Sequence, residues 1–304
     1  METVLKTVDL GKRFGQRWAV KGIDLEVHRG DIFCFLGPNG AGKSTTIRMI
    51  LTLLKPTAGT VQLFGKDPHK NRVAALARVC GIVEKPDFYL YLTAYKNLEL
   101  LGSLTRSITR KEIMQALSRV GLAQRAHDRV RTFSHGMKQR LGIAQALLTG
   151  PELIILDEPT TGLDPQGMKD VRELIQRLAR EEGMTIFLSS HLLSEIEQVA
   201  TRMAVVHRGE VVAQGAVAEL LAKEATDYAL QASPVKQALK IMKPLPWIQV
   251  LASNEQTIEL KLEPGRAAEL IKVLVAQGIE VFALSPRRTL EDFFLKVTKG
   301  APEI

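Results

Sequence analysis

The clearest chemical signature in the sequence is a glycine-rich stretch, GPNGAGKST, at residues 37–45. It matches the Walker A pattern G-x-x-x-x-G-K-[ST], whose backbone N–H groups curl around nucleotide phosphates because its glycines carry no Cβ. A helix beginning near Lys43 would add the positive end of its dipole. Lys43 would direct its charge at the β- and γ-phosphates, and the Ser44 hydroxyl could bind Mg²⁺. The residues predicted to bind the nucleotide are Gly37, Pro38, Asn39, Gly40, Ala41, Gly42, Lys43, Ser44 and Thr45.

Two acidic residues follow a second apolar run, LIIL, at residues 153–156. An acid at the end of another parallel strand is where proteins with a phosphate loop hold Mg²⁺. Asp157 is therefore predicted to hold the metal through water, and Glu158 to polarise the attacking water as a general base. His191 follows a third apolar run, TIFL at 185–188, at the sheet edge where α/β proteins place ligands. We expect His191 to contact the γ-phosphate.

These candidate residues require a sheet that brings the ends of three strands together. The run DIFCFLG at 31–37 is continuous and apolar, as expected for a strand buried on both faces. An amphipathic helix at 165–183 separates the two later apolar runs, and this alternation predicts an α/β sheet. Residues 1–30 read as short strands separated by glycine turns, residues 92–130 have helical periodicity, and 203–215 read as a hairpin. The first domain is predicted to span residues 1–222.

The remaining residues, 223–304, are predicted to form a separate domain. From 226 to 285 the strand and helix patterns follow the order β-α-β-β-α-β, which is that of a ferredoxin-like sandwich. A final helix is predicted at 289–298. This domain could help two chains to pair, regulate them, or simply cover surface.

The composition limits the class of protein. The 304 residues carry a formal net charge of +8, which permits contact with anionic membranes, nucleotides or nucleic acid without choosing among them. The two cysteines, Cys34 and Cys80, lie inside apolar runs, which indicates a reducing compartment, and their spacing fits no metal site. No signal peptide is recognisable, and no run approaches the ~18 apolar residues of a membrane helix. We therefore expect a cytosolic chain whose membrane role requires a partner.

Residues 133–148, FSHGMKQRLGIAQALL, supply the deciding motif. They resemble the signature segment of ATP-binding cassette (ABC) transporters, L-S-G-G-Q, at Ser134 and Gly136, and depart from it at Phe133, His135 and Met137. With the phosphate loop and the acids in the expected order, the chain resembles an ABC nucleotide-binding subunit over residues 3–220. The resemblance implies a P-loop NTPase cassette with a RecA-like core, an N-terminal antiparallel β subdomain and a helical subdomain at 86–145.

The resemblance also implies a mechanism. Two cassettes pair head to tail, and each ATP with its Mg²⁺ lies between one chain's phosphate loop and the signature segment of the other, where a helix start at Ser134 and Gly136 favours anions. Phe14 matches the aromatic residue that stacks on adenine, with Trp18 as a weaker candidate, and Asp164 matches the aspartate that links the two sites. ATP closes the pair and hydrolysis reopens it. This cycle of closing and reopening drives a separate permease, which places the chain at the cytoplasmic face of the cell membrane.

Glu84 lies between a short apolar run and the aromatic residues Phe88, Tyr89 and Tyr91, in CGIVEKPDFYLYL at 80–92. By itself, an acid after a strand is typical of a solvated loop. Most of the family places a glutamine here, which contacts Mg²⁺ and links the site to the permease, and a carboxylate binds Mg²⁺ more strongly than an amide. We therefore predict that Glu84 binds the metal and passes this signal to the aromatic cluster. The alternative is a tolerated substitution.

Within the family, Glu84 and the closing residues TLEDFFLKVTKG at 289–300 resemble cassettes of the bacitracin-resistance and lantibiotic-immunity type. That type implies export of a peptide antibiotic, a drug or a lipid-like substrate. Two alternatives stay open: an importer cassette with a regulatory C-terminal domain, and a translation- or ribosome-associated ABC ATPase. Nucleic acid is not an expected partner, because the basic stretch RAHDRVR at 125–131 is most simply a solvated surface.

Overall fold

The computed structural model describes residues 2–84, 86–224, 227–263, 265–286 and 290–299. The chain divides into two compact units, Met1–Gln214 and Gly215–Ile304. The division falls before the predicted domain boundary at 222, because helix α8 (Val217–Glu224) packs against α11 (Leu290–Lys299) of the second unit. The strand and the helix predicted to begin at residues 226 and 289 have those first residues outside the described part of the chain.

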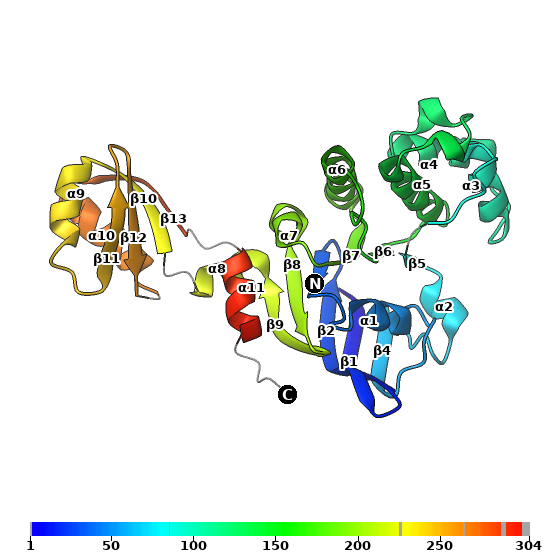
Figure 1. The fold of residues 1–304 in the computed structure, drawn as a ribbon, viewed down its shortest axis with the longest axis horizontal. Coiled ribbons are helices and arrows are strands. Elements are labelled where there is room, and N and C mark those ends of the chain that lie inside the picture. The colour runs from blue at the N-terminus through cyan, green and yellow to red at the C-terminus, as the bar shows by residue number, and fades with distance from the viewer. Residues whose placement is uncertain (1, 85, 225–226, 264, 287–289, 300–304) are drawn as a thin grey trace. The chain divides into compact units, whose positions relative to one another are not determined.

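A six-stranded sheet forms the centre of the first unit (Figure 1). Its strand order is β5-β6-β7-β3-β8-β9, and the neighbours from β5 to β8 run parallel. The strands are β3 (Ile32–Leu36), β5 (Val79–Ile82), β6 (Leu153–Leu156), β7 (Thr185–Ser190), β8 (Arg202–His207) and β9 (Glu210–Ala216). Strands β3, β6 and β7 are buried at every position, which explains their continuous apolar runs. The predicted α/β core is confirmed, and the carboxyl ends of these three neighbours meet at one edge of the sheet.

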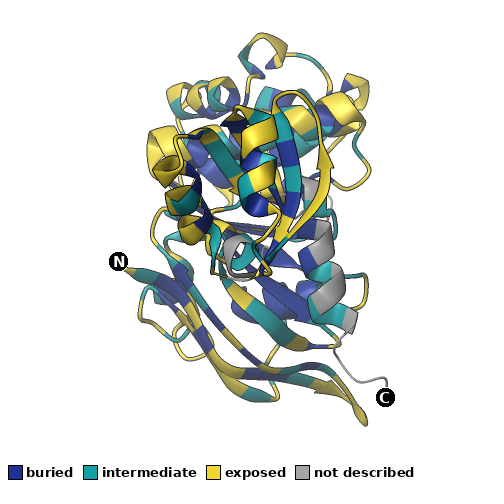
Figure 2. Cartoon of the chain, turned by 90° about the vertical axis from the view of Figure 1, so that its left-hand side faces the viewer, coloured by how far each residue is buried: buried dark blue, intermediate teal, exposed yellow. Residues whose placement is uncertain are grey.

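A second, antiparallel sheet in this unit has the order β2-β1-β4, formed by β1 (Thr3–Phe14), β2 (Arg17–His28) and β4 (Ala58–Leu63). Buried and exposed positions are interleaved along its strands (Figure 2). The expectation of short strands separated by glycine turns was wrong here, because Gly11 and Gly22 lie inside long strands, close to shifts in the pairing register. Such irregularities use glycine without ending a strand.

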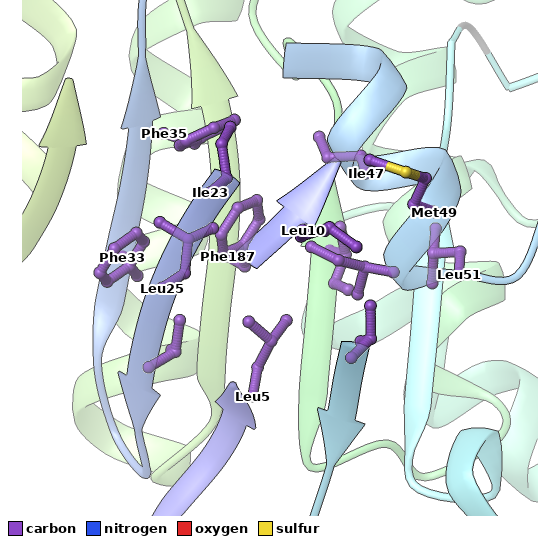
Figure 3. Close-up of a cluster of buried hydrophobic side chains, with 14 of the residues drawn as sticks. Leu5, Leu10, Ile23, Leu25, Phe33, Phe35, Ile47, Met49, Leu51 and Phe187 are labelled. Carbon is purple, nitrogen blue, oxygen red and sulfur yellow. The ribbon is translucent and has the colours of Figure 1, made fainter. Parts of the chain in front are cut away.

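The hydrophobic core of this unit gathers side chains from both sheets and from helix α1 (Lys43–Ile50). Figure 3 shows Phe33 of β3 and Phe187 of β7, whose rings stack with centroids 5.6 Å apart. Leu5 and Leu10 of β1 and Ile47 of α1 belong to the same fully buried cluster. The core therefore fixes α1, and with it the phosphate loop, between the two sheets.

Several helices of the first unit begin at side-chain caps that the sequence supplies. Asp164 caps α6 (Pro165–Glu182) through a 3.1 Å hydrogen bond from Gly167 N, and Thr109 with Glu112 forms a capping box on α4 (Arg110–Arg119). The remaining elements are α2 (Arg72–Leu76), α3 (Ala94–Ser103), the 3₁₀ turns Ala123–Arg125 and Val130–Thr132, α5 (His135–Leu147) and α7 (Leu193–Val199). Within the described ranges, the structure contains no helix with the length and apolar character needed to cross a membrane.

The second unit contains one antiparallel sheet of order β11-β12-β10-β13. The predicted order β-α-β-β-α-β is observed: β10 (Asp227–Ser233), α9 (Val235–Met242), β11 (Ile248–Ser253), β12 (Thr257–Leu262), α10 (Ala267–Ala276) and β13 (Glu280–Pro286). Every second residue of β10 and β12 is buried, and these residues share a core with Met242 of α9 and Leu274 of α10. This unit therefore has a hydrophobic core of its own.

An ion-pair cluster joins distant parts of the first unit and predicts a pH dependence. The carboxylate of Glu152 accepts hydrogen bonds from Arg78 and Arg29, and these bonds hold its pKa at about 2, against an ordinary value of 4.5. Because the pKa is lower in the folded state, the ionised form stabilises the fold. This contribution is complete above pH 4.5 and is lost as the pH falls from about 4.5 to about 2.

We expect the melting temperature of Glu152→Gln to be lower than that of the wild type at neutral pH and to converge with it as the pH falls through that window. The difference is small, because all three side chains are partly exposed and water screens the pairs. Calorimetric melting curves measured between pH 7 and pH 2 test this expectation. Parallel curves for the two proteins would contradict the assignment.

Candidate active site

The phosphate loop connects β3 to α1 and follows a path that only glycine allows at position 42. Gly42 has φ of 106°, and a Cβ there would lie 2.7 Å from the carbonyl oxygen of Ala19. The side chain of Lys43 is 4% exposed, and its Nζ donates to the carbonyl oxygens of Gly37 at 2.8 Å and Pro38 at 3.2 Å. The loop therefore curls around the ammonium group of Lys43, which is the arrangement expected for a site that binds phosphates.

The three residues predicted to be catalytic meet at one carboxylate. Glu158 Oε1 lies 3.2 Å from Lys43 Nζ, and Glu158 Oε2 lies 3.1 Å from His191 Nδ1 and accepts a 2.9 Å hydrogen bond from Thr161. Burial alone would raise the pKa of Glu158, but the hydrogen bonds from Thr161 and Lys43 and the charge of the lysine lower it below its ordinary value. The carboxylate is therefore ionised at neutral pH and able to accept a proton.

The predicted metal acid is held by a residue that the sequence reasoning missed. Asp157 is 8% exposed, and its Oδ1 accepts a 2.6 Å hydrogen bond from Ser189 Oγ, which in turn accepts a 2.9 Å bond from Glu158 N. Ser189 is a fully buried hydroxyl residue at the end of β7, and a polar residue closing a buried strand was the available signal. This serine fixes both acids relative to the strand that leads to His191.

The donors at this edge of the sheet fit Mg²⁺ bound together with a nucleotide. Ser44 is half-buried at the start of α1, and in the described part of the chain its hydroxyl makes no hydrogen bond. Hydroxyl and carboxylate oxygens are ligands that Mg²⁺ prefers, with phosphate oxygens and water completing its shell. Ser44 and Asp157 are the residues that would hold the ion.

Glu84 lies on a loop beside Asp157, but its carboxylate is paired with a residue outside the candidate metal site. The backbone N of Asp157 donates to the carbonyl oxygen of Ile82 at 2.9 Å, so the loop carrying Glu84 begins next to the metal acid. Glu84 has φ of 68°, and its carboxylate is paired with Arg48, one turn after Ser44 on α1. The role of Glu84 as a metal ligand stays a prediction.

Both candidate aromatic residues for the adenine, Phe14 and Trp18, lie on the hairpin formed by β1 and β2. Lys12 and Phe14 share one face of the hairpin, since Lys12 Nζ lies 5.3 Å from the centre of the Phe14 ring. Lys12 pairs with Val20, whose methyl group lies near the Cβ position of Gly42. Trp18 pairs with Arg13, and its ring lies beside Gly11. Phe14 is 53% exposed and accessible to a base.

The signature residues and Asp164 come together at two adjacent helix starts. Ser134 caps α5 by accepting a 3.2 Å hydrogen bond from Met137 N, as Asp164 caps α6. A Cβ on Gly136 would lie 3.2 Å from the Cα of Gly167, so the first turns of the two helices touch. Figure 1 shows α5 well apart from α1, so the signature segment does not line the phosphate loop of its own chain.

Comparisons with known proteins find relatives along the whole chain. The family described as "ABC transporter" matches residues 20–161. The chain is 41% identical over 302 residues to the bacitracin transport ATP-binding protein BcrA of Bacillus licheniformis, covering 99% of each chain. It is 37% identical to the lantibiotic transport ATP-binding protein SrtF of Streptococcus pyogenes, over 69% of this chain and 89% of that protein. A dimeric post-hydrolysis ATP-binding cassette bound to ADP and phosphate aligns with a TM-score of 0.61 and 26% identity, over 70% of this chain and 98% of its own.

Proposed function

The chain belongs to the family of ATP-binding proteins of ABC transporters, and we propose that its cluster of Lys43, Glu158 and His191 hydrolyses ATP to drive a separate permease. The observation that carries this proposal is the single carboxylate of Glu158, which lies within 3.2 Å of both Lys43 Nζ and His191 Nδ1. A lysine for phosphates, a proton acceptor and an orienting histidine are the parts that ATP hydrolysis needs.

Each residue has a separate task in this reaction. Lys43 binds the β- and γ-phosphates, and Ser44 and Asp157 hold Mg²⁺, which when bound neutralises charge on the phosphate oxygens. Glu158 accepts the proton of the attacking water at a carboxylate oxygen. His191 keeps that carboxylate oriented through its Nδ1 and can contact the γ-phosphate through its other nitrogen.

We propose that the active form is a head-to-tail pair of chains. The signature segment lies apart from α1 in its own chain (Figure 1), so a second copy is needed to place Ser134 and Gly136 over the nucleotide. The dimeric cassette among the solved relatives supports this arrangement. Asp164, beside the signature in the same chain, would then lie at the junction of the two sites.

Ser134→Arg is expected to abolish ATP-dependent pairing, because a long cation would occupy the exposed helix start that faces the partner's nucleotide. Light scattering of the full chain with ATP, in a Glu158→Gln background, measures the mass. Thr109→Arg is a matched control, because it also removes an exposed cap, at the start of α4. Normal pairing of Ser134→Arg would contradict the trans arrangement.

We propose that the transported substrate is a peptide antibiotic of the bacitracin class and that the chain works at the cytoplasmic face of the membrane. The similarity to the bacitracin transport protein extends over 99% of both chains and therefore includes the second unit. Cells expressing the chain with its permease should survive higher bacitracin concentrations, and Glu158→Gln should remove this protection. Equal survival of the two strains would contradict the substrate assignment while leaving the ATPase activity open to a separate assay.

A cavity beside the edge strand β5 is the surface we propose for the permease. Its volume is about 840 Å³, and it is lined largely by apolar side chains, including Leu53, Val73 and Val83. Val83 directly precedes Glu84, and beyond that loop Tyr89 and Tyr91 are exposed. A permease segment bound here would touch the loop that carries Glu84, which begins beside Asp157.

Glu84→Ala is expected to leave basal ATP hydrolysis within about twofold of wild type and to remove most of its stimulation by the permease. The loop would lose its link to α1 while the Lys43–Glu158 site stays intact. ATPase assays in proteoliposomes, with and without permease, measure both rates, and Glu84→Gln is the mild control. Full stimulation of Glu84→Ala would contradict the coupling role.

A further inference from the structure

A buried carboxylate that has no task in the mechanism above lies behind the active site, on α7. Glu195 is 5% exposed, and its Oε2 accepts a 2.6 Å hydrogen bond from Thr160 Oγ1 and a 3.4 Å bond from Ser190 Oγ. Both hydroxyl residues are themselves buried. Burying a carboxylate is costly, so apolar packing does not explain its presence here.

The two partners of Glu195 adjoin the reacting groups in the chain. Only Pro159 separates Thr160 from Glu158, and Ser190 directly precedes His191. The carbonyl oxygen of Ser190 also accepts a 3.2 Å hydrogen bond from Gly37 N, at the start of the phosphate loop. Glu195 therefore joins the segment that carries the general base to the segment that carries the histidine.

The second oxygen of Glu195 is less constrained than the first. No hydrogen-bond partner for Oε1 occurs among the residues that the structure describes, and the side chain borders a cavity of about 20 Å³. Cys34 lines the same cavity, and burial together with the charge of Glu195 raises the pKa of its thiol. The carboxylate is thus anchored on one side only, by the hydroxyl groups of the two catalytic segments.

We propose that Glu195 is a positioning residue that holds the segment carrying Glu158 at a fixed distance from the segment carrying His191. The two segments have two contacts. Glu158 Oε2 and His191 Nδ1 lie 3.1 Å apart at the reacting groups, and Glu195 joins the neighbouring residues Thr160 and Ser190. This second contact restricts how far either segment moves alone. The proposal rests on the ATPase function proposed above.

Thr160→Val tests the proposal because it keeps the shape of the side chain and removes the hydrogen-bond donor. We expect kcat for ATP to fall about ten- to hundredfold, while KM for ATP changes less than about twofold. Thr160→Ser retains the hydroxyl and should restore kcat. Glu195→Leu, which removes the acceptor, should also lower kcat, and the double variant Thr160→Val/Glu195→Leu should be no slower than the slower single variant.

Ile196→Val is the matched control, because it shortens a buried neighbour on α7 that borders the same cavity without touching the network. It should lower the melting temperature and leave kcat unchanged. Wild-type kcat in Thr160→Val, equal losses in Thr160→Val and Thr160→Ser, or additive losses in the double variant would each overturn the proposal. Absence of ATPase activity in the wild-type chain would instead overturn the proposed function.

Discussion

Glu158→Gln is expected to reduce the ATP turnover number by about 10²–10⁴-fold while ATP binding persists, since that is the usual contribution of a positioned general base. The amide keeps the size of the side chain and still accepts a hydrogen bond from Thr161, but it does not take up a proton at neutral pH. Because hydrolysis reopens the pair, the variant should accumulate as an ATP-bound dimer. Turnover is measured with radiolabelled ATP, and the mass by light scattering.

Glu173→Gln provides the matched control for this experiment. It makes the same chemical change on α6, at an exposed residue that pairs with Lys169. Its turnover should equal that of the wild type. Rapid turnover in Glu158→Gln would exclude Glu158 as the general base and with it the role of the Lys43–Glu158–His191 cluster.

Lys43→Ala is expected to weaken ATP binding by about 10- to 100-fold. A hydrogen bond to a charged group contributes about 1.5–3 kcal/mol, and each 1.4 kcal/mol is a factor of ten in affinity. The substitution also removes the ammonium that lies 3.2 Å from Glu158, so the pKa of this glutamate should rise. Titration with a fluorescent ATP analogue gives the dissociation constant.

The same substitution at Lys21, a partly exposed lysine, separates the loss of a phosphate contact from a general loss of charge. Lys21 lies on β2 and is paired with Glu210 on the surface. Lys21→Ala should bind ATP with wild-type affinity. Equal affinities for Lys43→Ala and the wild type would show that the loop at 37–45 is not the phosphate site.

The parts of the fold that the sequence predicted are those with strong local signals. Strands β3, β6 and β7 were recognised because each contains a continuous apolar run that is buried on both faces of the sheet. The N-terminal sheet was predicted less well, since Gly11 and Gly22 are typical of turns, whereas long-range pairing between β1 and β2 keeps both residues inside strands. Local patterns carry no information on such pairing.

The candidate site shows the same difference between residues with a local sequence signal and residues placed by long-range contacts. Lys43, Asp157, Glu158 and His191 follow apolar strands or a glycine pattern, so their positions could be predicted from neighbouring residues. Ser189 and Thr160 act through contacts with residues far away in the sequence, and a hydroxyl group alone does not indicate which partner it meets. The pairing of Glu84 with Arg48 could not be predicted for the same reason.

The most direct test of the account is the composition of the complex that the full-length chain forms in its own cells. After detergent extraction in the presence of ATP, the Glu158→Gln form should be purified and its partners quantified by mass spectrometry. We predict a multi-span permease in stoichiometric amount, without ribosomal proteins, nucleic acid or an external substrate-binding protein. Ribosomal components in place of a permease would contradict the transport function, and a substrate-binding protein bound to the permease would contradict export.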